Sequence, residues 1–250
     1  MVSTMIGVAL TASLAAAQLP ADFSGVWRPV DAPLLAVRVS VTRRAAGLIL
    51  HPTSLPGPGP IGDLGPETDR FLDWAAAAGQ TIWQVLPLGP TGPGNSPYSG
   101  ISMRAGNPLL IHAAPGQGPH EYATDGGVGE SAAAGGTAGR VDYHAARREK
   151  DAQFRAWWAR FPESAAMLAG YEAFRHDPRQ AEWLEDWALF AALRRARHGA
   201  PWTEWEPPLR RREPAALARA RAELRDEIDY QTYVQFLFGS QWGRVREVAR

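Results

Sequence analysis

The stretch Gly47-Leu48-Ile49-Leu50-His51-Pro52-Thr53-Ser54-Leu55-Pro56 decides the predicted fold, because a short apolar run passes directly into a proline-rich loop. Residues 47–50 are bounded by turn-forming residues, which is typical of a strand buried on both faces. A helix is expected from Pro66, a first-turn proline. A second apolar run, Thr81 to Leu86, leads into another loop rich in Pro and Gly, residues 87–108. Strand, loop, helix and strand within about forty residues make a βαβ unit of a parallel sheet.

The two long loops follow the two predicted strands, so both are expected at the same end of the sheet, facing one another across a shared mouth. The first loop contains His51 and Asp63. His51 has no obvious metal or triad partner in the sequence, which favours a structural connection at this position. Asp63 is the one local carboxylate that we retain as an outside candidate for chemistry, since it lies in a loop at the mouth.

The second loop places amide, hydroxyl and aromatic groups close together in Asn95, Ser96 and Tyr98. Sugars are bound by aromatic faces that stack on the ring and by polar groups that bond the hydroxyls. This mixture of groups therefore suits carbohydrate recognition, although a single such loop is weak support.

The rest of the chain differs from the βαβ segment on both sides. Residues 113–140, rich in Gly, Ala, Ser and Thr, are predicted to be a flexible connection. Helical periodicity then predicts helices at 152–161, at 180–197 and, as one long helix, from Pro214 toward the end. Only two convincing strands occur in the chain. A further strand is possible within residues 21–42, where apolar side chains alternate at Leu35, Val37, Val39 and Val41.

The first residues allow two interpretations. Met5 to Gln18 is an apolar run that ends in small residues, which resembles a secretory signal with cleavage after Ala17. No positive charge precedes this run, since the first is Arg28. A misplaced start or an upstream segment joined in frame is the alternative.

Composition excludes some classes of function. The 250 residues carry a formal net charge of zero, so there is no bulk electrostatic attraction to nucleic acid or anionic lipid. The chain has no cysteine, which excludes disulfides and thiolate metal sites. Ten tryptophans are compatible with sugar binding, but large core side chains would explain them equally well.

Several ordered motifs carry a resemblance to a known family. The chain resembles the amylomaltases, which are 4-α-glucanotransferases of glycoside hydrolase family 77, over roughly residues 43 to 250. The motifs that carry this resemblance are residues 47–56 with Ile61-Gly62-Asp63-Leu64-Gly65, Trp83 to Gly92, Asn95-Ser96-Pro97-Tyr98, Ala105 to Leu110, Trp183 to Phe190, Pro201-Trp202 with Pro208 to Glu213, and Gln241-Trp242-Gly243.

The resemblance implies an α/β fold, the N-terminal part of a (β/α)8 TIM barrel with a large helical insertion, the barrel being incomplete in this chain. Residues 43–112 would form the first βαβ unit of the catalytic barrel. Residues 113–140 would be the linker, and 141–250 the helical insertion and a following barrel helix. Residues 1–42 would be a signal-like or spurious extension.

The resemblance also implies retaining transfer of α-1,4-glucan segments through a covalent glycosyl-enzyme. The family's nucleophilic Asp and acid/base Glu lie downstream of the Gln241 motif, so we assign no catalytic residue within this chain. Ser96 and Tyr98 match residues that line the glucan groove, and Asn95 and Trp83 are expected beside them. No metal or organic cofactor is implied. The expected partners are maltooligosaccharides or glucans derived from starch or glycogen, and the expected compartment is the cytoplasm, with export as the alternative.

Some departures and rival functions remain open. Pro93 stands where many family members have a tyrosine linked to a secondary glucan contact, which puts that contact in doubt. An incomplete barrel would leave sheet edges and an apolar face open, so we expect the chain alone to be poorly soluble and inactive. The main alternative is a non-catalytic α-glucan-binding fragment. A Trp-rich helical interaction protein is disfavoured by the ordered motifs.

Overall fold

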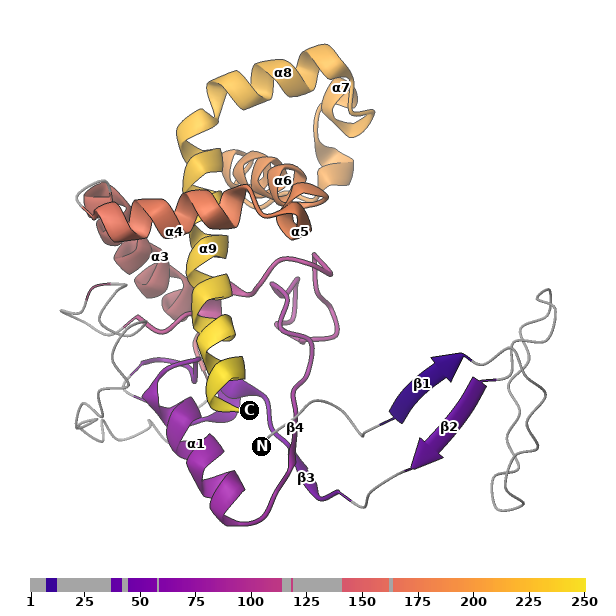
Figure 1. Ribbon diagram of the computed structural model, residues 1–250. Helices are drawn as coiled ribbons and strands as arrows, with labels where there is room; N and C mark the ends of the chain where they lie inside the picture. The colour runs from indigo at the N-terminus through magenta and orange to yellow at the C-terminus, as the bar shows by residue number, and fades with distance from the viewer. Residues whose placement is uncertain are drawn as a thin grey trace.

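The structure is a computed structural model that describes residues 8–12, 37–41, 45–57, 59–113, 118, 141–161 and 164–250. A long C-terminal helix, α9 (Arg225–Val248), is its central element (Figure 1). The βαβ unit and the two long loops lie around the C-terminal half of α9. The remaining helices gather around its N-terminal half (Figure 1).

The predicted βαβ unit is confirmed. Strands β3 (Gly47–Ile49) and β4 (Ile82–Gln84) are parallel and are connected by helix α1 (Pro66–Ala77). Both strands are shorter than the apolar runs that predicted them. The prediction that the first strand is buried on both faces is wrong for the described residues, because the side chain of Ile49 is 68% exposed. Both faces of a parallel sheet are buried only where helices cover both of them, and one crossover helix, α1, connects these two strands.

The predicted helices differ from the observed ones chiefly in their ends. Asp142 accepts hydrogen bonds from the backbone N–H groups of His144 and Ala145, both at 2.9 Å, and this cap starts a helix earlier than the apolar pattern does. The helix predicted at 180–197 is two helices, because Trp183 leaves helical geometry at φ −142°. The helices of this part are α3 (Tyr143–Arg160), α4 (Ala165–Arg175), α5 (Pro178–Ala181), α6 (Leu184–Ala196), α7 (Pro207–Arg210) and α8 (Pro214–Glu223).

The single long helix predicted from Pro214 is also wrong, because the chain turns at Leu224 (φ −108°, ψ 20°) between α8 and α9. Figure 1 shows that the two helices run in clearly different directions. Helix α4 was not predicted. Its N-terminus is capped by Ser164, whose side chain accepts from the Met167 N–H at 3.4 Å.

The largest apolar cluster, here called the aromatic core, lies where α9 packs against α3 and α4. Phe161 and Tyr233 approach with ring centroids 4.8 Å apart, and Phe161 meets Tyr171 edge-to-face at 5.3 Å. Such pairs stabilise the fold beyond the area that they bury. The buried members of the aromatic core are Ile111, Phe154, Trp157, Phe161, Met167, Tyr171, Tyr230, Tyr233, Val234, Phe236 and Leu237.

A second cluster joins the βαβ unit to α9. Leu64, Leu72 and Val245 are almost completely buried together, with Trp83 packed beside them. At the edge of this cluster Arg244 donates to both carboxylate oxygens of Asp69 on α1, at 2.9 Å each. Helix α9 therefore belongs to both packed regions and fixes the βαβ unit relative to the helices.

Two more strands, β1 (Val8–Ala12) and β2 (Val37–Val41), pair antiparallel, with Val8 opposite Val41. The strand predicted among residues 21–42 is confirmed for residues 37–41. The greater part of the signal-like segment and of the 113–140 connection lies outside the described residues. Among the helices that are described, none combines the length and the apolar character needed to cross a membrane.

Candidate functional site

The two long loops meet directly after the parallel strands, as predicted. Thr53 donates its backbone N–H to Nδ1 of His51 at 3.2 Å, so Nε2 carries the ring proton and donates to the Pro87 carbonyl oxygen at 3.4 Å. Nearby, the indole N–H of Trp83 donates to the Leu50 carbonyl at 2.8 Å. Burial lowers the pKa of His51, although the bond to Pro87 opposes this shift. His51 is therefore a neutral side chain that connects the starts of the two loops.

Asp63 is buried in an ion-pair cluster. Its carboxylate lies 2.9 Å from Nζ of Lys150 and 3.0 Å from Nδ1 of His112, and it also accepts from the Gly65 N–H at 3.0 Å. Burial by itself raises the pKa of this carboxyl, but Lys150 and His112 outweigh it and lower the pKa to about 2. A carboxylate so fully paired is suited to fixing the first loop. The structure gives no support to Asp63 as a candidate for chemistry.

Two buried glutamines of α9 hold the end of the second loop. Gln235 accepts from the Gly106 N–H at 2.7 Å and donates to the Gly106 carbonyl at 3.1 Å. Gln241 makes the same two bonds to His112, at 2.7 and 3.1 Å. Residues 105–112 with these two glutamines are here called the polar seam. A side chain at position 106 would overlap the ring of Phe238, so only glycine fits there.

The tip of the second loop is closed by its own backbone. The Gly92 N–H donates to the Ser99 carbonyl at 2.8 Å, and Ile101 N–H donates to the Pro90 carbonyl at 2.9 Å. Between them Gly94 (φ 84°) and Asn95 (φ 59°) both adopt left-handed backbone geometry. Glycine and asparagine are residues that tolerate this geometry, which accounts for their choice here.

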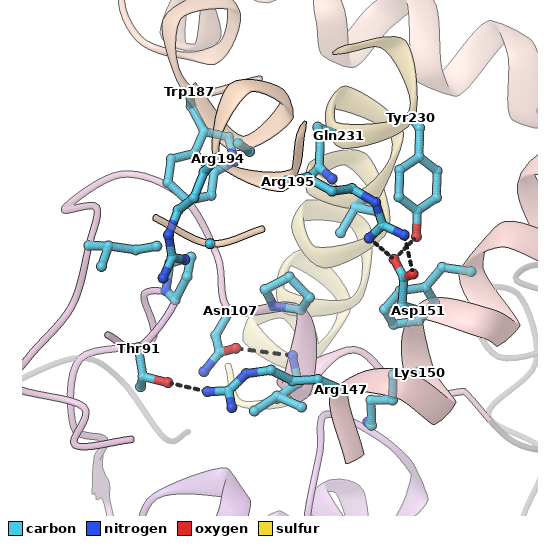
Figure 2. Close-up of a pocket in the computed structure, with 18 of the residues that line it drawn as sticks. Thr91, Asn107, Arg147, Lys150, Asp151, Trp187, Arg194, Arg195, Tyr230 and Gln231 are labelled. Carbon is cyan, nitrogen blue, oxygen red and sulfur yellow. Dashed lines mark hydrogen bonds and ion pairs between the residues drawn. The ribbon is translucent and has the colours of Figure 1, made fainter. Parts of the chain in front are cut away.

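A cavity of about 470 Å³ lies between this loop, α3, α6 and α9 (Figure 2). Arg147 of α3 extends along its floor and donates to Oγ1 of Thr91 at 3.2 Å and to Oδ1 of Asn95. On the opposite side Arg195 pairs with Asp151 at 3.0 Å, and Asp151 also accepts from the Tyr230 hydroxyl at 2.8 Å (Figure 2). Arg147 thus connects α3 to the loop, whereas the contacts of Asp151 join α3 to α6 and α9.

Of the predicted sugar contacts, Asn95, Ser96 and Tyr98 lie together on the loop tip. The Tyr98 side chain is 75% exposed, and its N–H donates to Oγ of Ser96 at 3.3 Å. Trp83 lies apart from them, packed against Phe71 with ring centroids 5.2 Å apart. Its ring and its N–H both make structural contacts.

Comparison with known proteins gives a family assignment. The family profile described as 4-alpha-glucanotransferase, glycoside hydrolase family 77, matches residues 50–250. The chain belongs to this family. The resemblance drawn from the motifs is therefore confirmed.

Relatives from bacteria and plants give the same assignment. A 4-alpha-glucanotransferase of Thermus thermophilus is 43% identical over 208 residues, which are 82% of this chain and 40% of that protein. The chloroplastic/amyloplastic 4-alpha-glucanotransferase of Solanum tuberosum is 42% identical over 229 residues, 89% of this chain and 39% of its own length. The chain thus spans well under half of the length of these relatives.

A solved structure is similar to this member of the 4-alpha-glucanotransferase family. It is an amylomaltase from Streptococcus agalactiae in complex with acarbose, with a TM-score of 0.68 at 28% identity. The alignment covers 83% of this chain and 41% of that structure.

Sequence reasoning missed the side chains that position the second loop. Gln235 and Gln241 are six residues apart, and so are their backbone partners Gly106 and His112. This equal spacing becomes meaningful only once the two segments are known to lie side by side. Arg147 gave no signal either, because a charged residue on a helix usually faces solvent.

Proposed function

We propose that this chain supplies part of the glucan-binding groove of a 4-α-glucanotransferase that transfers α-1,4-glucan segments between maltooligosaccharides. The single observation that carries the proposal is the junction of the two loops, where His51 contacts the Pro87 carbonyl at the ends of adjacent parallel strands. Ligands of open α/β folds and of barrels bind at this end of the strands. Membership of the family supports the same assignment.

The loop tip offers the contacts that a glucan needs. Tyr98 is exposed enough to stack on a sugar ring, while Ser96 and Asn95 contribute hydroxyl and amide groups beside it. Arg147 orients the Asn95 amide by donating to its oxygen. We assign Trp83 a supporting role at the edge of the groove, since its N–H already bonds to the Leu50 carbonyl.

The chemistry itself requires two carboxyl groups about 5 Å apart for retention of configuration. Among the described residues, Asp63 lies in the first loop, and Asp151 lines the cavity beside the second loop. Both are committed to cationic partners, Lys150 and Arg195, at 2.9 and 3.0 Å. We therefore place the nucleophile and the acid/base outside these residues and expect this chain to bind glucan without transferring it.

The remaining parts of the proposal follow the family. The βαβ unit would be the first of a (β/α)8 barrel, with the helices α3 to α8 as an insertion and α9 as a barrel helix. The chemistry would need no cofactor, and the protein would act in the cytoplasm.

Calorimetric titration of the purified chain with maltoheptaose tests the binding. We expect Tyr98→Ala to weaken binding by roughly tenfold, because stacking on the ring is lost. Trp202→Ala is the matched control, since Trp202 is an exposed aromatic residue outside the loop. Equal weakening by both variants, or no binding by the parent chain, would overturn the proposal.

Incubation of the same chain with maltotriose tests the placement of the carboxylates. Longer maltooligosaccharides should not accumulate. Sustained disproportionation would show that the described residues contain the reacting pair, and it would contradict this placement while leaving the family unchanged.

A further inference from the structure

The cavity between the second loop and the helices has an excess of positively charged side chains in its lining. Its lining includes five cationic side chains and one carboxylate, Asp151. Its volume, about 470 Å³, is within the range of sites for small organic molecules, roughly 300 to 1,000 Å³. The cationic side chains are Arg147, Arg148, Lys150, Arg194 and Arg195.

Part of this charge is compensated within the protein. Lys150 pairs with Asp63 at 2.9 Å, and Arg195 pairs with Asp151 at 3.0 Å. Arg147 is different, since its bonds are to neutral oxygens of Thr91 and Asn95. Within the described part of the chain, neither Arg147 nor Arg194 forms an ion pair with a carboxylate.

Arg147 and Arg194 come from different helices and extend into the same cavity (Figure 2). Burial is the main factor that lowers the pKa of the Arg147 guanidinium. The positive charge of Arg194 lowers it further. Two guanidinium groups that repel one another in a partly enclosed site are stabilised by an anion placed between them. Each guanidinium has N–H donors in a planar fork that matches the oxygens of a phosphoryl group.

The rest of the lining indicates what the anion is attached to. Trp187, Phe190 and Pro108 supply apolar surface beside the two arginines. A bare inorganic ion would leave that surface uncovered, whereas an organic group would cover it. Thr91 and Gln231 add neutral polar atoms to the lining.

We propose that this cavity binds the phosphate monoester of a small sugar, with Arg147 and Arg194 holding the phosphoryl group and Trp187 and Phe190 contacting the sugar. The site differs in its chemistry from the proposed glucan contacts, which are neutral. It shares a wall with them, because Arg147 bonds to Asn95 on the loop that carries Ser96 and Tyr98. Occupation of the site would therefore fix the position of that loop.

Calorimetric titration with glucose 6-phosphate, inorganic phosphate and maltose separates the contribution of the phosphoryl group to binding from that of the sugar. Glucose 6-phosphate should bind, inorganic phosphate should bind more weakly at the same site, and maltose should not displace either. Binding should weaken as sodium chloride is raised, since salt screens the two guanidinium charges. Equal binding of maltose and glucose 6-phosphate, or equal binding of both phosphates, would overturn the proposed ligand class.

Charge-removing variants identify the residues. Arg194→Gln should weaken glucose 6-phosphate binding by roughly tenfold or more, because charge-assisted bonds are lost. Arg194→Lys should recover part of the affinity. Arg246→Gln, at an exposed arginine of α9, is the matched control and should have no effect.

Circular dichroism confirms that each variant is folded, and the maltoheptaose titration is repeated on each one. Unchanged phosphate binding in Arg194→Gln would refute the site. Loss of phosphate binding with retained maltoheptaose binding would support it and would keep its outcome separate from that of the glucan proposal.

Discussion

The aromatic core and the polar seam are both buried against α9, yet they are stabilised in opposite ways. In the aromatic core, rings pack against rings, and the hydroxyls of Tyr171 and Tyr233 are buried without a hydrogen-bond partner among the described residues. In the polar seam, Gln235 and Gln241 each satisfy both a donor and an acceptor of the loop backbone. Apolar packing tolerates an unpaired hydroxyl, whereas an irregular loop needs each buried backbone group to be paired.

This difference explains how a loop without regular secondary structure can be held rigidly. The backbone groups of Gly106 and His112 bond to side chains of a distant helix, which take the place of a neighbouring strand. The Asp63 cluster does the same for the first loop, since Lys150 bonds both to Asp63 and to the Ile111 carbonyl, at 2.9 and 2.6 Å. Both loops of the proposed glucan groove therefore depend on polar contacts with the helices.

The largest expected effect is at the Asp63 cluster. Asp63→Asn should lower the free energy of unfolding by about 4 kcal/mol, because it leaves the buried Lys150 ammonium without its counter-charge. Urea denaturation at neutral pH measures this, with the exposed Asp73→Asn on α1 as control, expected to change little. If Asp63→Asn lowers the free energy of unfolding no more than the control does, the Asp63–Lys150 pair does not stabilise the fold.

The same residue predicts a pH dependence. The folded-state pKa of Asp63, about 2, is below its ordinary value of 3.8, so its contribution to stability is complete above about pH 4 and is lost as pH falls through 2. Denaturation between pH 5 and pH 2 should show this loss in the parent chain. Asp63→Asn should lack that part of the pH dependence, and identical profiles would contradict the assignment.

An intermediate effect is expected in the polar seam. Gln241→Leu should lower the free energy of unfolding by about 2 kcal/mol, because the N–H and the carbonyl of His112 lose their partners. Gln231→Leu on the same helix removes only a bond to Glu227 and should cost much less. Amide hydrogen exchange should speed up at residues 105–112 in the first variant. Exchange that increases instead in the aromatic core would break the distinction between the two regions.

The smallest expected change in the free energy of unfolding is an increase, at Tyr233 in the aromatic core. Tyr233→Phe removes a buried hydroxyl that has no partner in the described part of the chain, and it should stabilise the protein by about 1 kcal/mol. Tyr230→Phe is the matched comparison, since that hydroxyl donates to Asp151 at 2.8 Å, and it should destabilise by a similar amount. Thermal unfolding monitored by circular dichroism distinguishes the two. Destabilisation by Tyr233→Phe would show that its hydroxyl has an unrecognised partner.

The sequence predicted the parallel βαβ unit and the meeting of the two loops because these follow from local patterns. A short apolar run between turn-forming residues favours a strand, and parallel strands place their following loops at one end. The motifs also predicted the family, and the grouping of Asn95, Ser96 and Tyr98 followed from their nearness in the chain. Helix ends were less predictable, because a cap such as Asp142 or a turn such as Leu224 interrupts the apolar periodicity.

By itself, then, the sequence determined the parallel βαβ unit and the family to which the chain belongs. The tertiary structure alone decided the roles of Asp63, Gln235, Gln241 and Arg147, whose long-range partners are 49 to 129 residues away in the chain. A polar side chain on a helix has the same local pattern whether it faces solvent or a buried loop. Only the packing of α9 and α3 against the loops removes water from these groups, and that loss of water makes their hydrogen bonds decisive.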